Sequence, residues 1–450
     1  MHAALRLGVL STALLLTACS SQHYLVNPPL AVDGNGPRYS ISDVPAQPNN
    51  SDSLHIVVTL SGGGYRAAAL AYAVLDALND TVIQWEGTPR TLLDEVDIIS
   101  SVSGGSLAAA DFLVHRDDYF PGFEQRVLGL DLQSKAVSRF LSPSGLFAQT
   151  SSRYGRGDLL QEVLDTQLFH GATYGALPRR RPVVILNATD IHSGERFGFT
   201  QEEFDHLCSD LSQVPVARAV AASMAVPVVA SPITLWNHSS NCPVRPRAQR
   251  SIPFIDEARY LHLADGGLAD NTGARMPLEY VAAAGGLLQS TRLGGYKGIK
   301  RGVFIIVNAM RTPRDDEDDT PDTPGILRQF QSVHAVPIKR SSVDGIGLLG
   351  AAVERWAQQI REANPQVLDG LLDSDLRFHV IEIGLKELPG RAEFLPLRSL
   401  PTELRISRAE VQSIKQFVRA KLDGDPAWRS LLEDLSSSAR IPEPSVAAAK

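Results

Sequence analysis

The chain has 450 residues, of which 44% are hydrophobic and 21% are charged, and its formal net charge is −7. This composition allows one large folded domain or two, and it excludes a disordered chain or a fibrous repeat. The negative balance argues against a general nucleic-acid binder, because no basic field would collect phosphates.

The first 18 residues have the layout of a secretory signal peptide. One basic residue, Arg6, precedes an apolar run that is too short to span a bilayer. The sequence Leu16-Thr17-Ala18-Cys19 resembles the bacterial lipobox, after which the peptide is cleaved and Cys19 takes lipid; an ordinary signal peptide with a chance cysteine is the alternative. Ser20 in place of Asp indicates sorting to the outer membrane in enteric-type bacteria. We therefore expect a protein of the bacterial cell envelope, held on the membrane by a lipid on Cys19.

A glycine-rich turn follows the first predicted strand. Residues 19–53 are rich in Ser, Pro and Asn and predict a tether. The apolar run Leu54–Leu60 then predicts a strand, followed by Gly62-Gly63-Gly64 and a helix over Arg66–Leu78. Glycines permit close approach, and N–H groups at the start of a helix have no internal partner. The turn therefore predicts an anion cradle, for a phosphate or an oxyanion, beside the positive charge of Arg66. Its spacing fits neither nucleotide-binding glycine motif, so nucleotide binding is disfavoured.

The second predicted strand leads to a serine between small residues. The run Val96–Ser101 is followed by Val102-Ser103-Gly104-Gly105, and a helix is predicted over Ser106–His115. This is close to G-x-S-x-G, the nucleophile elbow that lifts a serine hydroxyl above a sheet edge. Ser101 stands where the strict motif has its first glycine. A plain turn or a helix N-cap explains the same residues without catalysis.

The rest of the chain alternates strand and helix patterns. Such alternation predicts an α/β fold with a mostly parallel sheet covered by helices on both faces. Cys208 and Cys242 lie in turn-rich sequence; an oxidising envelope permits a disulfide between them, and two unpaired thiols are the alternative. No cysteine pattern suggests a metal site. Further strands are predicted over Val183–Thr189, Tyr260–Ala264, Gly302–Asn308 and Phe378–Ile383, and helices over Leu159–Leu168, Val216–Ala225 and Pro277–Ala284.

Asp265 follows the predicted strand Tyr260–Ala264 and precedes two glycines. A buried carboxylate at this place can take a proton from a nearby hydroxyl, whereas an Asp-Gly turn is the plain alternative. Residues 311–425 are expected to complete the same domain with a strand and helices, one of them after Pro401. Residues 426–450 are predicted to be a disordered tail.

Together, the three motifs resemble those of the patatin-like phospholipases. "GGGYRA" is similar to the glycine-rich signature of that family, "SVSGG" to its G-x-S-x-G and "DGGLADN" to its Asp-Gly-[Gly/Ala] motif, with features similar to the cytosolic phospholipases. The resemblance covers residues 54–310, which are taken as the catalytic domain. It implies a patatin-like three-layer fold around a mostly parallel central sheet.

The resemblance also implies a serine acyl hydrolase with a Ser–Asp dyad and no catalytic histidine, cofactor or metal. Ser103 would be the nucleophile and Asp265 the group that takes its proton. The N–H groups of Gly62, Gly63 and Gly64, helped by Arg66, would hold the oxyanion. The substrate would be a phospholipid, a lysophospholipid or another acyl-ester lipid.

Two other readings stay open. An α/β-hydrolase with a Ser-Asp-His triad needs a histidine, and His262, His334 and His379 are the candidates. The second alternative is a non-catalytic envelope lipoprotein whose hydrolase-like fold binds a lipid or a partner.

Overall fold

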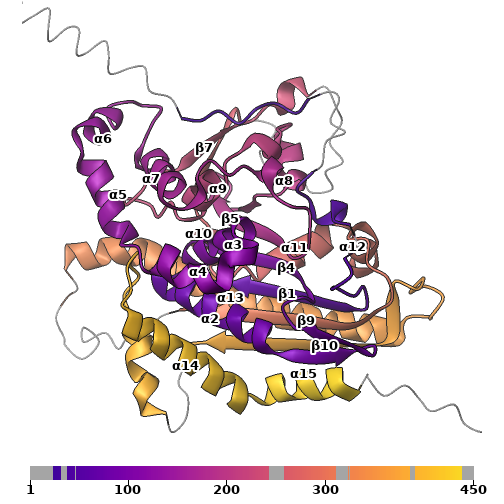
Figure 1. Cartoon of the computed structure of the whole chain (residues 1–450). Helices are drawn as coiled ribbons and strands as arrows, with labels where there is room; N and C mark the ends of the chain where they lie inside the picture. The colour runs from indigo at the N-terminus through magenta and orange to yellow at the C-terminus, as the bar shows by residue number, and fades with distance from the viewer. Residues whose placement is uncertain are drawn as a thin grey trace, which may run out of the picture.

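The buried apolar runs form the strands of one mixed sheet in the computed structural model (Figure 1), which describes residues 24–31, 38–45, 47–242, 258–310, 323, 325–385 and 391–437. Eight strands lie in the order β10-β9-β1-β4-β5-β8-β7, and β6 pairs with β5. The five strands from β10 to β5 are parallel, and β6, β7 and β8 are antiparallel. A separate hairpin joins β2 and β3. The strands are β1 (Leu54–Leu60), β2 (Val82–Trp85), β3 (Thr88–Thr91), β4 (Val96–Val102), β5 (Val183–Asp190), β6 (Arg196–Gly198), β7 (Ile233–Trp236), β8 (Tyr260–Asp265), β9 (Ile299–Asn308) and β10 (Leu372–Gly384).

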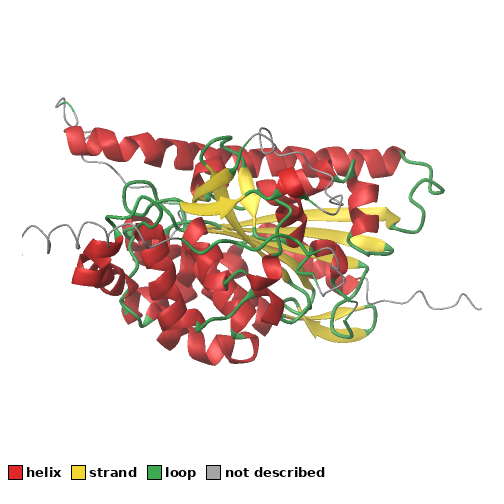
Figure 2. Ribbon diagram, turned by 90° about the horizontal axis from the view of Figure 1, so that it is seen from above, coloured by secondary structure: helices red, strands yellow, loops and turns green. Residues whose placement is uncertain are grey.

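Helices cover both faces of this sheet, which confirms the predicted three-layer α/β architecture. Figure 2 shows one long helix, α13, along one face and most of the other helices on the opposite face. The helix α13 contacts α10, α11 and β10. On the other side, α2 contacts both α14 and α3, and α3 contacts α9. The helices are α2 (Gly64–Asp80), α3 (Gly104–Val114), α4 (Tyr119–Phe123), α5 (Leu132–Leu141), α6 (Pro143–Ala148), α7 (Arg156–Leu164), α8 (Gln201–His206), α9 (Val216–Ser223), α10 (Gly267–Asp270), α11 (Arg275–Ala283), α12 (Leu287–Leu293), α13 (Ile326–Glu362), α14 (Arg408–Gly424) and α15 (Pro426–Ser437).

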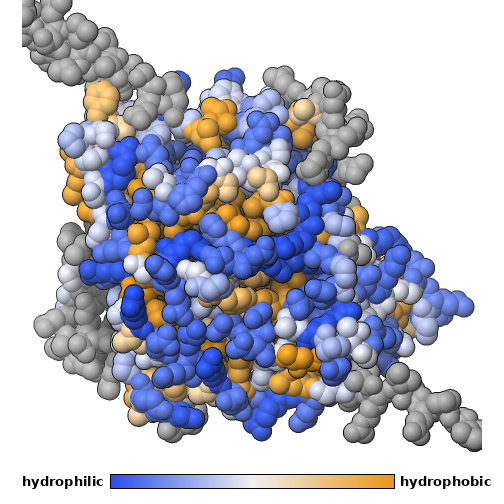
Figure 3. Space-filling model, in the orientation of Figure 1, coloured by the Kyte–Doolittle hydropathy of each residue, from blue (hydrophilic) through white to orange (hydrophobic). Residues whose placement is uncertain are grey.

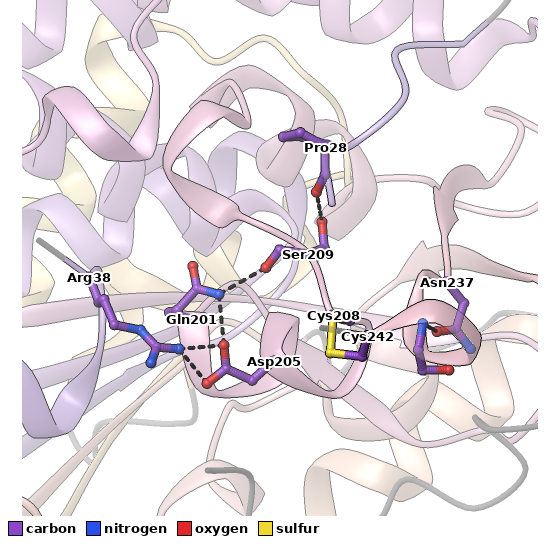
Figure 4. The surroundings of a disulfide bond; sticks show 9 residues. Pro28, Arg38, Gln201, Asp205, Cys208, Ser209, Asn237 and Cys242 are labelled. Carbon is purple, nitrogen blue, oxygen red and sulfur yellow. Dashed lines mark hydrogen bonds and ion pairs between the residues drawn. A yellow bond between two sulfur atoms is a disulfide. The ribbon is translucent and has the colours of Figure 1, made fainter. Parts of the chain in front are cut away.

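Part of the expected tether instead packs on the domain. The Asn27 side chain donates to Ser209 Oγ at 2.8 Å, and the Tyr39 ring is buried. Figure 4 shows Arg38 against Asp205, beside the disulfide of Cys208 and Cys242. Residues 24–31 and 38–45 therefore do not form a free linker.

The predicted disorder of the tail is wrong for residues 426–437, which form α15. This helix begins at Pro426, a residue favoured in the first turn, and buries Trp428, Leu431 and Leu435. Residues 438–450, the predicted signal peptide and Cys19 lie outside the described residues. Among the helices that are described, none is both long and apolar enough to cross a membrane.

Candidate active site

The glycine loop and the serine elbow lie side by side because their strands are neighbours. Leu60, the last residue of β1, pairs with Ser101 near the end of β4. A Cβ atom on Gly104 would lie 2.1 Å from the carbonyl oxygen of Gly64, so only glycine fits at this contact. The chain thus places Gly62–Gly64 directly against the turn that carries Ser103.

Ser103 adopts the sharp conformation expected of a nucleophile elbow. Its φ is 51° and its ψ is −118°, between the end of β4 and the start of α3. A positive φ is costly for a residue other than glycine, by about 1–3 kcal/mol, and is found where a fold holds a functional side chain in place. The residue is 8% exposed, so little of it reaches solvent.

A ladder of three serine hydroxyls holds the elbow from below. Ser223, at the end of α9, accepts the Ser103 N–H at 2.8 Å and donates to the carbonyl oxygen of Asn187 at 2.6 Å. Its hydroxyl also lies 2.9 Å from Ser106, which lies 3.1 Å from Ser101. Ser101, where the strict motif has glycine, belongs to regular strand and has no positive φ. Ser101 therefore fits in place of the glycine of the strict motif, because its hydroxyl is hydrogen-bonded within the strand and helix around it.

Asp265 is the carboxylate that interacts with the Ser103 hydroxyl. It ends β8 opposite Ala188 of β5 and is 3% exposed. Oδ1 accepts the Gly267 N–H at 2.8 Å, while Oδ2 is buried and has no hydrogen bond of normal geometry to a described residue. Burial raises the pKa of Asp265 from 3.8 to about 6, and interactions with the Ser103 hydroxyl and the Gly267 N–H oppose that rise.

The three glycines of the loop are not equivalent. The Gly62 N–H donates to the carbonyl oxygen of Asn271 at 2.9 Å, so it is already occupied. In the described part of the chain, the N–H groups of Gly63 and Gly64 make no hydrogen bond. Among the predicted donors, Gly63 and Gly64 therefore fit an oxyanion site, and Gly62 shapes it.

Arg66 binds main-chain carbonyls rather than facing an empty site. Its Nε donates to the carbonyl oxygen of Ala309 at 2.9 Å, and Nη1 donates to that of Leu400 at 2.5 Å. The Tyr65 N–H donates to the carbonyl oxygen of Glu403 at 2.8 Å. These contacts fasten the loop to the C-terminal segment, which indicates a positioning role for Arg66.

Two polar residues at the site were not singled out from the sequence. Asn271 places Oδ1 2.4 Å from where a Cβ on Gly62 would lie, and 2.9 Å from where one on Gly267 would lie. Its Nδ2 donates to Ser342 Oγ on α13 at 3.0 Å. Asn271 belongs to "DGGLADN" and Ser223 to "ARAVAASMAVP", and the spacing in neither stretch assigns these residues a role.

The candidate histidines make other contacts. His262 lies 3.1 Å from Thr234 Oγ1 on the exposed face of β8, and His379 on β10 lies 3.0 Å from Asp434. The side chain of His334 lies outside the described residues. No group of three or more metal-ligating side chains is found within the described residues.

Comparison with known proteins identifies the domain. A search of curated proteins found no match. Among solved structures, human GIVD cytosolic phospholipase A2 is similar at 11% identity and a TM-score of 0.46, covering 86% of this chain and 63% of that chain. The same protein in complex with a methyl gamma-linolenyl fluorophosphonate inhibitor and terbium chloride is similar at 14% identity and a TM-score of 0.44, covering 86% of this chain and 60% of that chain. VipD from Legionella pneumophila is similar at 13% identity and a TM-score of 0.27, covering 82% of this chain and 67% of that chain. The chain thus spans less than two thirds of the human chains.

A protein-family model, Patatin-like phospholipase, matches residues 58–278, a range that begins in β1 and ends in α11. This range includes the glycine loop, the serine elbow and Asp265, and so it coincides with the site described above. The chain therefore contains a patatin-like phospholipase domain over residues 58–278.

Proposed function

We propose that this protein is a serine acyl hydrolase that cleaves fatty-acyl esters of phospholipids or lysophospholipids with a Ser103–Asp265 dyad. The observation that carries the proposal is a buried carboxylate beside a serine on a strained elbow, next to a loop with two unoccupied N–H groups. This combination supplies a base, a nucleophile and an oxyanion site in one place.

The proposed reaction begins when Ser103 Oγ attacks the ester carbonyl carbon and Asp265 takes the hydroxyl proton. The tetrahedral oxyanion accepts hydrogen bonds from the Gly63 and Gly64 N–H groups. Asp265 then gives the proton to the leaving alcohol, and an acyl-enzyme remains on Ser103. In the second half, Asp265 takes a proton from water and the resulting hydroxide attacks the acyl-enzyme. The bond between the acyl carbon and Ser103 Oγ then breaks, Asp265 returns the proton to Oγ, and the fatty acid leaves.

The experiment is a lipid panel hydrolysed by purified protein and read by product mass. Ser103→Ala and Asp265→Asn are each expected to lower kcat by at least about 10³-fold, because each removes an essential reacting group. His262→Ala and His379→Ala are the matched controls, and both are expected to keep activity. Loss of activity in either histidine variant would support the triad alternative.

Covalent labelling tests the non-catalytic alternative. A fluorophosphonate probe is expected to label the protein, and the label is expected to be absent from Ser103→Ala. A protein that is folded but takes no label and cleaves no lipid would instead be the lipid-binding alternative.

Membrane attachment is a separate part of the proposal. We propose that the protein is anchored in the bacterial cell envelope, at the outer membrane, by lipid on Cys19. The support is the lipobox-like sequence that ends at Cys19, followed by Ser20. Metabolic labelling with a fatty acid is expected to mark the protein, and Cys19→Ser is expected to abolish that mark.

A further inference from the structure

Apolar side chains project into solvent from three elements near Ser103. We define them as the apolar rim, and their exposed fractions lie between 41% and 75%. Val228, the most exposed, has a φ of 74°, which is costly for a β-branched residue. The rim consists of Leu146 and Phe147 on α6, Val228 and Val229 in the loop after α9, and Val333 and Val336 on α13.

Hydrogen bonds fix the first two elements of the rim at the active site. The carbonyl oxygen of Ala225, at the start of the loop after α9, accepts the Asp265 N–H at 2.9 Å. Ser231, at the end of the same loop, accepts the Gly157 N–H at 2.9 Å and so holds the first turn of α7, the helix that follows α6, beside it. Figure 3 shows apolar residues among hydrophilic ones at the edge of the molecule over α5 and α6, and further apolar residues across the middle of the same face.

The third element is the N-terminal part of α13. It extends beyond the edge of the sheet at which β4 ends and Ser103 follows. Ser341 Oγ donates to the carbonyl oxygen of Gly267, two residues after Asp265, at 3.1 Å. From Ser341 back to Val333 the helix rises by about 12 Å, and Figure 2 shows one end of α13 extending beyond the strands. In the other direction Trp356 packs on Phe304 of the sheet. The exposed valines therefore stand beyond the active-site edge.

Two of the three elements lie in segments whose charge is opposite in sign to that of the whole chain, and the loop after α9 has no charged residue over residues 224–232. The 26 residues 132–157 contain four Lys or Arg and no Asp or Glu, and the 18 residues 326–343 contain three Lys or Arg and no Asp or Glu. Acidic residues make up one in nine of the chain, so about five would be expected by chance in segments of this combined length. Exposed apolar side chains among basic ones are the pattern of a surface that inserts into an anionic lipid interface.

The N-terminal segment begins at the same place. The Tyr24 N–H donates to the carbonyl oxygen of Arg153, within the acid-free segment 132–157, at 2.8 Å. Leu25 and Val26 are 45% and 48% exposed. Cys19 is five residues before Tyr24, a span of at most about 18 Å. A lipid on Cys19 would thus enter a bilayer close to the rim.

We propose that the apolar rim docks on an anionic phospholipid bilayer, with the sheet edge that carries Ser103 facing the lipid. The choice of lipid as substrate rests on the proposed function, but docking itself can be measured without any hydrolysis. The rim has exposed apolar side chains on three elements, and basic residues lie in the same segments as two of them. Such a surface suits a bilayer, in which apolar side chains enter the headgroup boundary and basic groups meet phosphates.

The experiment measures sedimentation with vesicles. The full chain carries Cys19→Ser, to remove the anchor, and Ser103→Ala, to leave the vesicles intact. Vesicles contain phosphatidylcholine alone or with phosphatidylglycerol. The triple variant Phe147→Ser, Val229→Ser and Val336→Ser is expected to lose at least about tenfold in partitioning on both vesicles. Lys135→Gln with Lys339→Gln is expected to lose at least about tenfold only on the anionic vesicles.

Matched controls lie at the opposite end of the sheet. Val82 and Val367 are 65% and 58% exposed and lie near the starts of the parallel strands, so Val82→Ser with Val367→Ser should leave partitioning unchanged. With Ser103 restored, all variants should hydrolyse a monomeric short-chain ester at the parent rate, which shows that they fold. Rim variants that sediment like the parent, or that change only its self-association, would overturn the docking proposal. Rim-dependent sedimentation without any ester hydrolysis would overturn the proposed function alone.

Discussion

Asp265 shows how burial prepares a carboxylate to act as a base near neutral pH. Its pKa of about 6 lies above 3.8 because burial penalises the charged form. The base must be ionised to take the Ser103 proton, so kcat/KM is expected to rise with pH through about 6 and level off above about 7. A rate profile on a neutral ester measures this, and a midpoint near pH 4, or a flat profile from pH 5 to 8, would contradict the assignment.

The same shift predicts a cost to stability. The folded state binds the Asp265 proton more tightly than the unfolded state, so folding stability falls as pH rises from about 4 to about 6. The loss is about 3 kcal/mol above that window. Asp265→Asn removes the buried charge and keeps an acceptor for Gly267, so this variant is expected to be more stable than the parent at pH 8. Urea unfolding at pH 8 and pH 4 tests this. If the stability that Asp265→Asn gains over the parent at pH 8 is not smaller at pH 4, the buried charge of Asp265 is not its cause.

The serine ladder predicts different effects for two buried serines. Ser223→Ala leaves the Ser103 N–H without its acceptor, so we expect a loss of about 1–3 kcal/mol in unfolding free energy. Because the elbow then loses its support, kcat is expected to fall about tenfold with KM little changed. Ser101→Gly, which restores the strict motif and leaves that bond intact, is the control and should keep kcat within about threefold. Equal kcat in both variants would remove the positioning role of Ser223.

At the scale of elements, the sequence predicts best where burial is continuous. The six predicted strands are confirmed because each contains an apolar run in the sheet, although β9 begins three residues and β10 six residues before the predicted start. The predicted helices are confirmed as α2, α3, α7, α9, α11 and α14. The sequence did not predict α13, since Pro337 and three glycines interrupt its pattern, and its burial against the sheet overrides those residues.

The site was predictable in part for a related reason. Ser103, Asp265 and the glycines follow strand ends, and local sequence marks strand ends well. The bonds of Arg66 to Ala309 and Leu400 join residues more than 240 positions apart, and no local pattern encodes them. The same holds for the bond of Ser223 to Ser103, which depends on how α9 packs beneath the elbow.

The disulfide predicts a stability effect that is separate from catalysis. It joins Cys208, in the turn after α8, to Cys242 after β7, across 34 positions. Closing a loop of this length restricts the unfolded chain by about 3–4 kcal/mol. Reduction is expected to lower the free energy of unfolding by that amount, and the urea midpoint with it. Ester hydrolysis should stay intact, because the described hydrogen bonds around Ser103 and Asp265 do not involve either cysteine. Identical midpoints for reduced and oxidised protein would contradict this.

At the scale of the whole molecule, the matched family range is smaller than the folding unit. The range 58–278 stops before β9, which lies between β1 and β10 and is buried along almost its whole length. Later residues also contact the active site directly, since Ser342 binds Asn271 and the carbonyl oxygen of Leu400 binds Arg66. The C-terminal part thus completes both the sheet and the site.

A truncated chain tests this dependence. Ending the chain after Met310 would expose β9 as a long apolar edge strand and remove the acceptors of Arg66 on Leu400 and Thr402. We expect such a chain to be insoluble or to lack a cooperative thermal transition, and to show no hydrolysis. A chain that ends after Ser437 keeps α15, with Leu431 and Leu435 in the core, and is the matched control that should melt and hydrolyse like the full chain. Soluble yield, calorimetry and ester hydrolysis decide the matter, since a folded and active chain ending at Met310 would make everything after β9 dispensable.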